Sequence, residues 1–534
     1  MKKLLKIHEA DNMAVALQDL AAHESILCDG EPIFPTSSVS AKHKIALEDF
    51  KVGEAIVMYG VLVGKASRPI AKGEVLTTEN VKHETAKVKK KTSITSWIPP
   101  NIEKWKNRTY MGYHRKDGQV GTRNVWLFFP LVFCENRNIE VLKEVFEKEL
   151  LNQKTSDHRL FLRSLISGKD TNEPETIKEK VFDNVEVKFI THHGGCGGIR
   201  QDSESLARLL AGYVNNPNVA GCTVLSLGCQ NLQVKIFKDA LDKLNPKNEK
   251  PVLIFEQQQM GTVDEMLKII IKDSFEALKK ANDIARTPVP LSTLRIGLEC
   301  GGSDGFSGIS ANPALGYVSD LLVALEGTAV LSEFPELCGV EQELVNRCVS
   351  DHEAHRFLDL MNSFEKSVVE AGSGFDMNPS PGNIKDGLIT DAMKSAGAAK
   401  KGGTSPVEDV LDYGEYISKK GLNLLCTPGN DVESTTAMAG AGANIILFTT
   451  GLGTPTGNPV VPVLKISSNS ELAQRMPDII DFDAGPIIRG EKSIQQAGEE
   501  LLEFIIDVAS GVKTVKAMNL NQDDFIPWKR GVSL

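Results

Sequence analysis

The sequence predicts an α/β protein: a body built on parallel sheet, preceded by a small β-rich module. From about residue 110 onward, apolar runs alternate with segments of helical periodicity, which is typical of one parallel sheet or two. The runs are apolar at every position rather than at every second one, as in strands buried on both faces. In the first part of the chain the runs are short and are broken by Gly and Pro, as in a compact β-fold.

The chain divides where this pattern changes. Residues 1–86 are the predicted β-module. Residues 87–109 are basic and polar and contain two adjacent prolines, so we predict a linker there. We assign residues 110–288 to a central α/β domain and residues 289–534 to a C-terminal α/β domain.

Nine strands are predicted in the body. In chain order they are VWLFFPLVF (125–133), VEVKFI (185–190), GCTVLSL (221–227), PVLIF (251–255), LRIGL (294–298), TAVLSEF (328–334), LNLLCT (422–427), NIILFTT (444–450) and VPVLKI (461–466). Each is bounded by polar or Gly-rich segments, as expected for a strand of an α/β sheet.

Helices are predicted between these strands from spacing and from capping residues. One helix begins after Asp202-Ser203, which suit an N-cap, and its apolar residues recur on one face. Residues 234–244 show the same spacing. A third helix is predicted to begin with Asn312 as N-cap and Pro313 at the first helical position.

Bulk properties exclude several classes of protein. The chain has 534 residues, more than the roughly 250–300 at which single cores stop growing, so several domains are expected. A formal net charge of −10 argues against a nucleic-acid-binding surface, although a few local cations can still bind an anionic ligand. No run approaches the ~18–20 apolar residues of a membrane span, and the N-terminus lacks the apolar core of a signal peptide. Nine dispersed cysteines without a CxxC pair indicate reduced thiols and a cytoplasmic protein.

Polar residues collect after six of the predicted strands. The segments are KFITHHGGCGG, VLSLGCQNLQ, IGLECGGSDG, AVLSEFPE, NLLCTPGND and ILFTTGLGTPTGNP. Each has an ordinary interpretation alone, since a cysteine after a strand is more often a buried filler than a ligand. Ligands of open α/β sheets bind beyond the carboxyl ends of the strands, so the repetition predicts one shared site. The densest segment, residues 293–316, puts a carboxylate, a thiol, an aspartate and several glycines on one strand-to-helix turn.

Together these segments resemble the altronate/galactarate dehydratase family of sugar-acid hydro-lyases. The resemblance covers nearly the whole chain. KIHEADNMAVAL and HKIALEDFKVGEAIVMYGVLVGKA resemble the family's N-terminal β-clip module of the SAF type, and YHRKDGQVGTRN resembles the start of its central region. HHGGCGG, LGCQNLQ, LECGGSDGFSGISANPALG, NPSPGN, TPGND, GLGTPTG and FDAG are similar to its C-terminal region, most specifically at residues 299–316. The implied fold is a SAF-like β-clip followed by a Rossmann-like α/β body.

The resemblance also implies a reaction. Within the family, SEFPELCGVEQ and TPGND are closer to the altronate branch, whose reaction converts D-altronate to 2-keto-3-deoxy-gluconate in hexuronate catabolism. Fe²⁺, Mn²⁺ or another divalent metal is implied, together with a reductant. We expect a small anionic sugar acid as substrate, no nucleic-acid or membrane partner, and a homodimer or larger homo-oligomer.

The chain departs from the family pattern at several positions. Gln230 stands where the family usually has Glu, and Leu452 where it often has Arg. Thr77 and Glu79 replace two histidines of the altronate branch, and Ala398 and Ala443 replace two cysteines. These departures leave substrate identity and activity open.

Dehydration of a 2,3-dihydroxy acid removes the proton next to the carboxylate and expels the 3-hydroxyl group. A divalent metal can neutralise the charge that develops on the carboxyl, while a base and an acid move the protons. We predict His192 as the base, because histidine titrates near neutral pH. Asp304, Glu333 and Glu336 are predicted as catalytic acid or metal ligands.

Two kinds of metal site are compatible with the sequence. The candidate ligands are His192, Cys196, Cys229, Cys300 and Asp304. Oxygen ligands suit Mg²⁺, Mn²⁺ or Fe²⁺, whereas three loop cysteines suit an aconitase-like iron–sulfur cluster. We prefer the mononuclear site, because the cysteine spacing matches no known cluster motif.

The substrate-binding residues are predicted by charge and by position. Arg123, Lys394 and Lys465 are the cations proposed for the substrate carboxylate. His43, Lys44 and Tyr59 of the N-terminal module could close over the site as a lid. The remaining candidates are Ser303, Asn312, Asn383 and Asp431.

Two other functions stay open at this point. One is a lyase that acts on another 2-hydroxy acid, of the galactarate or sulfolactate type. The other is a non-catalytic protein that binds sugar acids, which the substitutions at Gln230 and Leu452 would permit.

Overall fold

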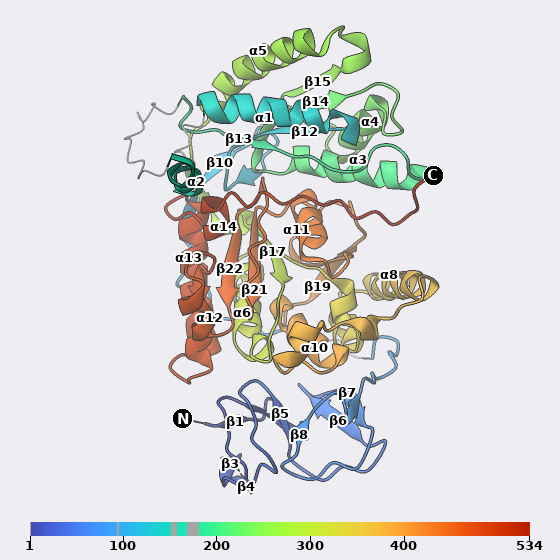
Figure 1. Ribbon diagram of the computed structural model, residues 1–534, viewed down its shortest axis with the longest axis vertical. Helices are drawn as coiled ribbons and strands as arrows, with labels where there is room; N and C mark the ends of the chain where they lie inside the picture. Colours follow the sequence, from blue (N-terminus) through green and yellow to red (C-terminus); the bar gives the residue numbers. More distant parts are fainter. Residues whose placement is uncertain (1, 93–95, 151–156, 168–180) are drawn as a thin grey trace. The chain divides into compact units, whose positions relative to one another are not determined.

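The computed structural model describes residues 2–92, 96–150, 157–167 and 181–534. Its contacts divide the chain into two compact units (Figure 1). The first unit contains residues 1–112 and 287–528, and the second contains residues 113–286 and 529–534. In the part of the chain that the structure describes, no helix combines the length and apolarity that a membrane crossing requires.

The N-terminal module of the first unit consists of short antiparallel strands. One sheet has the order β1-β2-β5-β8, a second has the order β6-β7-β9, and β3 pairs with β4. The strands are β1 (Leu4–Leu5), β2 (Met13–Ala16), β3 (Ile26–Cys28), β4 (Glu31–Ile33), β5 (Lys44–Ala46), β6 (Ala55–Met58), β7 (Val61–Ala66), β8 (Val75–Leu76) and β9 (Val81–Lys82). A small core of buried aliphatic side chains, including Ile33 and Ile45, holds the first sheet and the β3–β4 pair together.

The second unit is built on a four-stranded parallel sheet of order β13-β12-β14-β15. Its strands are β12 (Val125–Pro130), β13 (Glu186–Phe189), β14 (Val219–Ser226) and β15 (Val252–Glu256), and β11 (Val120–Gly121) pairs with β10 (Thr109–His114). Its helices are α1 (Asn136–Leu150), α2 (Asp157–Ser167), α3 (Arg200–Asn215), α4 (Val234–Leu244) and α5 (Val263–Asn282). Helices α1 and α5 lie on one side of this sheet and α3 and α4 on the other (Figure 1). Stacked Phe128 and Phe189 anchor the core between the sheet and α1.

The first unit continues with a seven-stranded parallel sheet of order β19-β20-β18-β17-β21-β22-β23. Its strands are β17 (Arg295–Cys300), β18 (Thr328–Leu331), β19 (Val407–Leu411), β20 (Gly421–Leu425), β21 (Ile445–Thr450), β22 (Val463–Ser467) and β23 (Phe482–Asp483), and β16 (Thr287–Pro290) pairs with β10. Its helices are α6 (Ala311–Ala324), α7 (Glu341–Arg347), α8 (Asp351–Glu370), α9 (Pro381–Lys385), α10 (Asp391–Ala398), α11 (Asp431–Gly440), α12 (Ser470–Arg475), α13 (Ile494–Ala509) and α14 (Lys516–Asn519).

The predicted α/β class with a SAF-type N-terminal module and a parallel-sheet body is confirmed, and the body has two parallel sheets. All nine predicted strands occur within a few residues of their expected ends. β19 was not predicted, because its sequence VEDVL carries two carboxylates inside a five-residue strand.

Two predicted helix starts are wrong by a few residues. Helix α3 begins at Arg200, so Asp202 lies in its first turn instead of capping it. Helix α6 begins at Ala311 with Ser310 as its N-cap residue. Asn312 is therefore helical, and its side chain is used elsewhere: it donates to Gly397 O (3.0 Å) and accepts from Thr449 Oγ1 (2.6 Å).

Candidate active site

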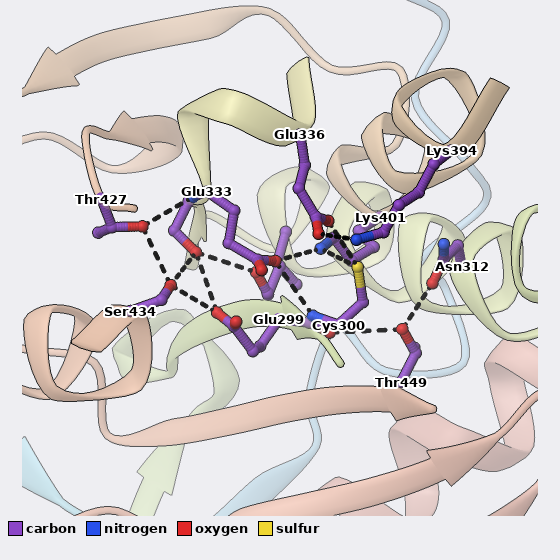
Figure 2. A network of polar contacts seen from close by, with 12 residues as sticks. Glu299, Cys300, Asn312, Glu333, Glu336, Lys394, Lys401, Thr427, Ser434 and Thr449 are labelled. Atoms are coloured by element: carbon purple, nitrogen blue, oxygen red, sulfur yellow. Dashed lines mark hydrogen bonds and ion pairs between the residues drawn. The ribbon is translucent and has the colours of Figure 1, made fainter. Parts of the chain in front are cut away.

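A buried cluster of carboxylates and lysines lies at the carboxyl ends of three neighbouring strands of the seven-stranded sheet (Figure 2). Glu299 and Cys300 are the last residues of β17, and Glu333 follows the end of β18. Asp431 is the first residue of α11, which follows β20. Because β17, β18 and β20 are adjacent, their ends bring these side chains together. A ligand-binding site of an open α/β sheet is expected at this edge.

Glu333 has a strained backbone that aims its side chain into the cluster. Its φ of 63° is left-handed, which is unfavourable for a residue with a side chain and is often retained at functional sites. Its backbone N–H donates to Thr427 Oγ1 (2.8 Å). Its Oε2 accepts from the backbone N–H of Cys300 (3.2 Å), which ties the ends of β17 and β18 together.

Two lysines supply positive charge to the cluster. Lys401, in the 3₁₀ turn η7 (Ala399–Gly402), contacts Glu333 Oε2 and Cys300 Sγ, each at 2.8 Å. Lys394 of α10 pairs with Glu336 Oε1 at 2.6 Å. Burial alone would lower the pKa of Lys401, but Cys300, Glu333 and Glu336 raise it well above its usual value, so the amine stays charged. Burial opposes ionisation of Glu336, yet Lys394 and Lys401 hold its pKa below the usual range.

The remaining carboxylates repel one another. Burial and the nearby Glu333 raise the pKa of Glu299. Burial, followed by Glu336, raises the pKa of Glu333, and burial with Glu333 and Glu336 raises that of Asp431 to about 7. Glu299 Oε2 accepts from Ser434 Oγ (2.7 Å) and Ser332 Oγ (3.2 Å). Glu299 Oε1 and Glu333 Oε1 are buried without a donor among the described residues, apart from the hydrogen bond that the two carboxyls can share when one is protonated, which opposes the rise in the Glu333 pKa.

These oxygens are arranged as a cation site would require. One ligand atom from each of Glu299, Glu333 and Asp431 lies within 4.8 Å of the others, and Cys300, Glu333 and Glu336 form a second such group. Three carboxylate oxygens are the donor set that Mg²⁺, Mn²⁺ and Fe²⁺ accept. A divalent cation would also satisfy the two oxygens without partners, so the residues present fit a metal. Gly301 allows this packing, since a Cβ there would lie 2.0 Å from Asp431 Oδ2.

Lys465 lies on the same face of the sheet as Glu299, two strands away. Glu299 is in register with Phe448 on β21, and Phe448 with Lys465 on β22. The Lys465 amine lies 3.6 Å from the centre of the Phe448 ring and donates to Thr456 O. Burial lowers the pKa of Lys465 to about 7, against the opposing effect of Asp431.

Asp304 is placed differently from its predicted roles as catalytic group and metal ligand. It is fully buried, and both of its oxygens already have donors. Those donors are the Phe306 N–H (3.2 Å), Ser307 Oγ (2.9 Å), Ser468 Oγ (2.7 Å), Asn469 Nδ2 (3.0 Å) and Lys42 Nζ (3.1 Å). No group of three described His, Cys, Asp or Glu ligand atoms includes it. These contacts favour a structural role, in which Asp304 holds the turn after β17 and pairs with Lys42 of the N-terminal module, while its catalytic and metal-binding roles stay predictions.

Asn383 and Asn312, two further residues predicted to bind substrate, form hydrogen bonds within the protein near the turn after β17. Asn383 Nδ2 donates to Ser303 O at 2.7 Å, which joins α9 to the same turn. Because Asn312 is bonded to Gly397 and Thr449, its amide is likewise used inside the protein.

The three predicted lid residues of the N-terminal module lie against the C-terminal part of the first unit. Lys44 Nζ donates to Gly387 O (2.5 Å), and a His43 ring nitrogen contacts Lys385 O (3.1 Å). The Tyr59 hydroxyl lies against Gly308, where a Cβ would approach it to 2.2 Å. The module is therefore docked by the buried side chains of Lys44 and Tyr59 and by a more exposed contact of His43.

The other predicted residues belong to the second unit. His192 is buried; its Nε2 contacts Pro130 O (2.8 Å), and its Nδ1 accepts from the Gly194 N–H (3.1 Å). Burial lowers its pKa to about 4. Arg123 pairs with Glu186 at 2.6 Å. Cys196 is half-buried and Cys229 is exposed, and no described group of three potential metal-ligand atoms includes either. These contacts favour structural roles for His192 and Arg123.

Several residues of the cluster were not predicted. Lys401 lies in AAKKGG, which alone looks like a solvated turn, and Ser434 and Thr427 are common polar residues at a helix start and a strand end. Glu299 stood in the segment that was singled out, but it was not assigned a role. Gln230, a departure from the family pattern, donates to Ser226 Oγ (2.6 Å) and accepts from the Gly228 N–H (2.7 Å).

Comparisons with known proteins cover the whole chain. Residues 2–84 match the altronate/galactarate dehydratase SAF domain, residues 112–282 the second domain of D-galactarate dehydratase/altronate hydrolase, and residues 291–533 the D-galactarate/altronate dehydratase C-terminal domain. The chain is 37% identical to altronate dehydratase of Bacillus subtilis over 100% of both chains. It is 35% identical to altronate dehydratase of Escherichia coli over 99% of both, and 30% identical to that organism's galactarate dehydratase (L-threo-forming) over 95% of this chain and 93% of the relative.

Proposed function

The chain belongs to the altronate/galactarate dehydratase family and is a lyase, and from this premise we propose that it dehydrates D-altronate to 2-keto-3-deoxy-gluconate. The observation that carries the proposal is the buried cluster of Glu299, Glu333, Asp431 and Lys401 at the carboxyl edge of the seven-stranded sheet. Loss of water from a sugar acid requires a site that stabilises negative charge on the substrate carboxyl and moves two protons.

The carboxylate group is proposed to hold the divalent metal. Glu299, Glu333 and Asp431 supply oxygen ligands, and the unpartnered Oε1 atoms of the two glutamates are the observation that supports this choice. A divalent cation bound there would act as a Lewis acid toward the substrate carboxyl. We prefer this group to Cys300, Glu333 and Glu336, because Lys401 and Lys394 already occupy the thiol and the Glu336 carboxylate.

Lys401 and Lys394 are proposed to stabilise the anionic transition state. Both amines are held by ion pairs, and their neighbours raise the pKa of each, so they keep their charge in the pH range of metabolism. A fixed cation in a site of low dielectric needs little reorganisation when negative charge develops. Glu333 and Cys300 fix Lys401, and Glu336 fixes Lys394.

Lys465 is proposed as the proton acceptor in place of His192. Its register with Glu299 places it on the same face as the cluster, and its amine extends over Phe448. A lysine whose pKa is lowered toward 7 is uncharged often enough to accept a proton near neutral pH.

The test is release of a 2-keto acid from a panel of aldonates and aldarates, with Fe²⁺ or Mn²⁺ and a reductant present. The proposal predicts turnover of D-altronate, with galactarate a poor substrate. Preference for galactarate or a sulfonated 2-hydroxy acid would reject the substrate assignment. Binding of sugar acids without any keto-acid release would reject the enzymatic role.

A further inference from the structure

A third group of potential metal ligands, outside the carboxylate cluster, lies where the N-terminal module ends. His83 follows β9, Cys338 follows the 3₁₀ turn η5 (Phe334–Leu337), and Asp391 is the first residue of α10. One ligand atom from each lies within 4.8 Å of the others. The group shares no residue with Glu299, Glu333 and Asp431, and it brings together three chain segments that are far apart in sequence.

Asp391 is the member that most needs a partner. Its side chain is completely buried, yet neither carboxylate oxygen accepts a hydrogen bond of good geometry among the described residues. The Cys338 thiol is close enough to hydrogen-bond to it, but a thiol is a weak donor and brings no positive charge. The next lysine on the same helix, Lys394, is paired with Glu336 at 2.6 Å. A buried carboxylate without a cation is costly to keep ionised, so a missing positive partner is a direct explanation.

His83 and Cys338 are placed to complete a site that solvent can reach. Both are half-buried, so an ion could enter and keep a water ligand. His83 accepts a long contact from the Ala392 N–H (3.4 Å), which holds the ring only weakly. The backbones are close here as well, because a Cβ at Gly339 would lie 3.0 Å from Thr85 Cγ2 and 3.2 Å from Ala392 Cβ.

The donor types indicate the class of metal. A carboxylate alone at the start of α10 could be explained by the positive end of the helix dipole. That effect does not account for an imidazole and a thiol converging on the same carboxylate. Imidazole nitrogen, thiolate sulfur and carboxylate oxygen with one open position is a set that Zn²⁺ accepts in tetrahedral geometry, whereas Mg²⁺ and Ca²⁺ do not use thiolates.

We propose that His83, Cys338 and Asp391 bind one zinc-class transition-metal ion, separate from the metal of the carboxylate cluster. This zinc-class ion ties the end of the N-terminal module to α10 and to the segment after η5. The ion would be held by a residue of the module and two of the C-terminal part. It would also sit beside the Glu336–Lys394 ion pair, since Cys338 lies two residues after Glu336 and Asp391 three before Lys394.

The test uses the full chain, stripped of metal and loaded with Co²⁺ as a probe. Co²⁺ bound to a thiolate has a ligand-to-metal charge-transfer absorption, so the proposal predicts this band in the wild type. Cys338→Ser should abolish the band, while Cys300→Ser, in the carboxylate cluster, and Cys134→Ser, exposed in the second unit, should retain it. A wild type without the band, or loss of the band in Cys300→Ser alone, would overturn the proposal.

Zn²⁺ titration provides the second measurement. His83→Ala should remove one Zn²⁺ equivalent or raise its dissociation constant at least about tenfold, and should abolish the rise in Tm that Zn²⁺ gives. His352→Ala, an exposed histidine on α8, is the matched control and should behave as wild type. Because His83 is half-buried at the end of a strand, its variant is expected to fold. Unchanged Zn²⁺ stoichiometry, affinity and Tm response in His83→Ala would overturn the site.

Discussion

Asp304 is a buried carboxylate whose contacts organise the turn after β17. Its two oxygens accept from a backbone N–H, two hydroxyls, an amide and the Lys42 amine. The sequence predicts a polar turn here, and the structure agrees. A pattern of residue types cannot tell a carboxylate that binds a ligand from one that satisfies the donors of its own loop, because both need the same residue at the same position.

Asp304→Asn is therefore expected to lower stability more than it lowers activity per folded molecule. The amide presents N–H groups to donors that need an acceptor, and Lys42 loses one partner. We expect a loss of about 2–4 kcal/mol in the free energy of unfolding. Thermal denaturation measures this effect, with Asp386→Asn, a part-exposed partner of the same lysine, as the matched control. A variant with unchanged Tm and a kcat/KM at least about 10²-fold lower would show instead that Asp304 acts in catalysis.

Lys401→Met is expected to lower activity per folded molecule more than it lowers stability, the reverse of Asp304→Asn. Removal of the cation should lower kcat/KM by about 10²–10³-fold, which is about 2.7–4 kcal/mol of transition-state stabilisation. Lys400→Met changes the neighbouring, part-exposed lysine, which faces Glu343, and should leave kcat/KM within about threefold. Equal effects of the two substitutions would show that Lys401 does not act in the site.

At the scale of elements, the docking of the N-terminal module depends on a buried lysine. Lys44 donates to Gly387 O, and burial lowers its pKa to about 7 against the attraction of Asp304. In the unfolded chain the same amine has a pKa near 10.4. Between these two values the unfolded state binds more protons, so the contribution of Lys44 to stability rises with pH. Below pH 7 the amine is charged in both states, and its burial carries the full cost.

Lys44→Met should remove this pH dependence. The stability of the wild type relative to the variant should rise from pH 7 to pH 9, by up to about 1.4 kcal/mol per pH unit. Tm measured at several pH values tests this, and Lys65→Met, a part-exposed lysine of the same module, is the control. A relative stability that is constant over that range, or that falls, would show that Lys44 does not titrate there.

Strands were more predictable than helix starts for a physical reason. A parallel strand buried on both faces must be apolar at every position, so runs such as IILFTT in β21 are visible without any contact information. A helix start depends on one backbone conformation, and Asn312-Pro313 satisfies the usual pattern one residue inside α6. β19 was missed because its two carboxylates are tolerated in an edge strand, where both side chains are partly exposed.

At the scale of the whole molecule, the order of strands in the seven-stranded sheet shows which polar strand ends form one site. Glu299, Glu333 and Asp431 lie at or after the ends of three different strands, and the order β20-β18-β17 brings them together. His192 of the second unit follows a similar strand end, but its ring contacts Pro130 at the end of β12 and Gly194 of its own loop. Sequence reasoning could find polar strand ends, but it could not tell which of them converge.

We propose that Glu299, Glu333 and Asp431 hold the divalent metal needed to dehydrate a sugar acid. The most direct measurement compares keto-acid release from D-altronate by metal-free and Mn²⁺- or Fe²⁺-loaded protein, for the wild type and for Glu299→Gln. We expect no activity without metal, recovery on loading, and at least a ~10²-fold lower kcat/KM for Glu299→Gln at the same metal concentration. Because one of several repelling carboxylates is neutralised, the metal-free variant should be at least as stable as the wild type. Full turnover by the metal-free wild type, or a loaded Glu299→Gln variant as active as the wild type, would contradict the account.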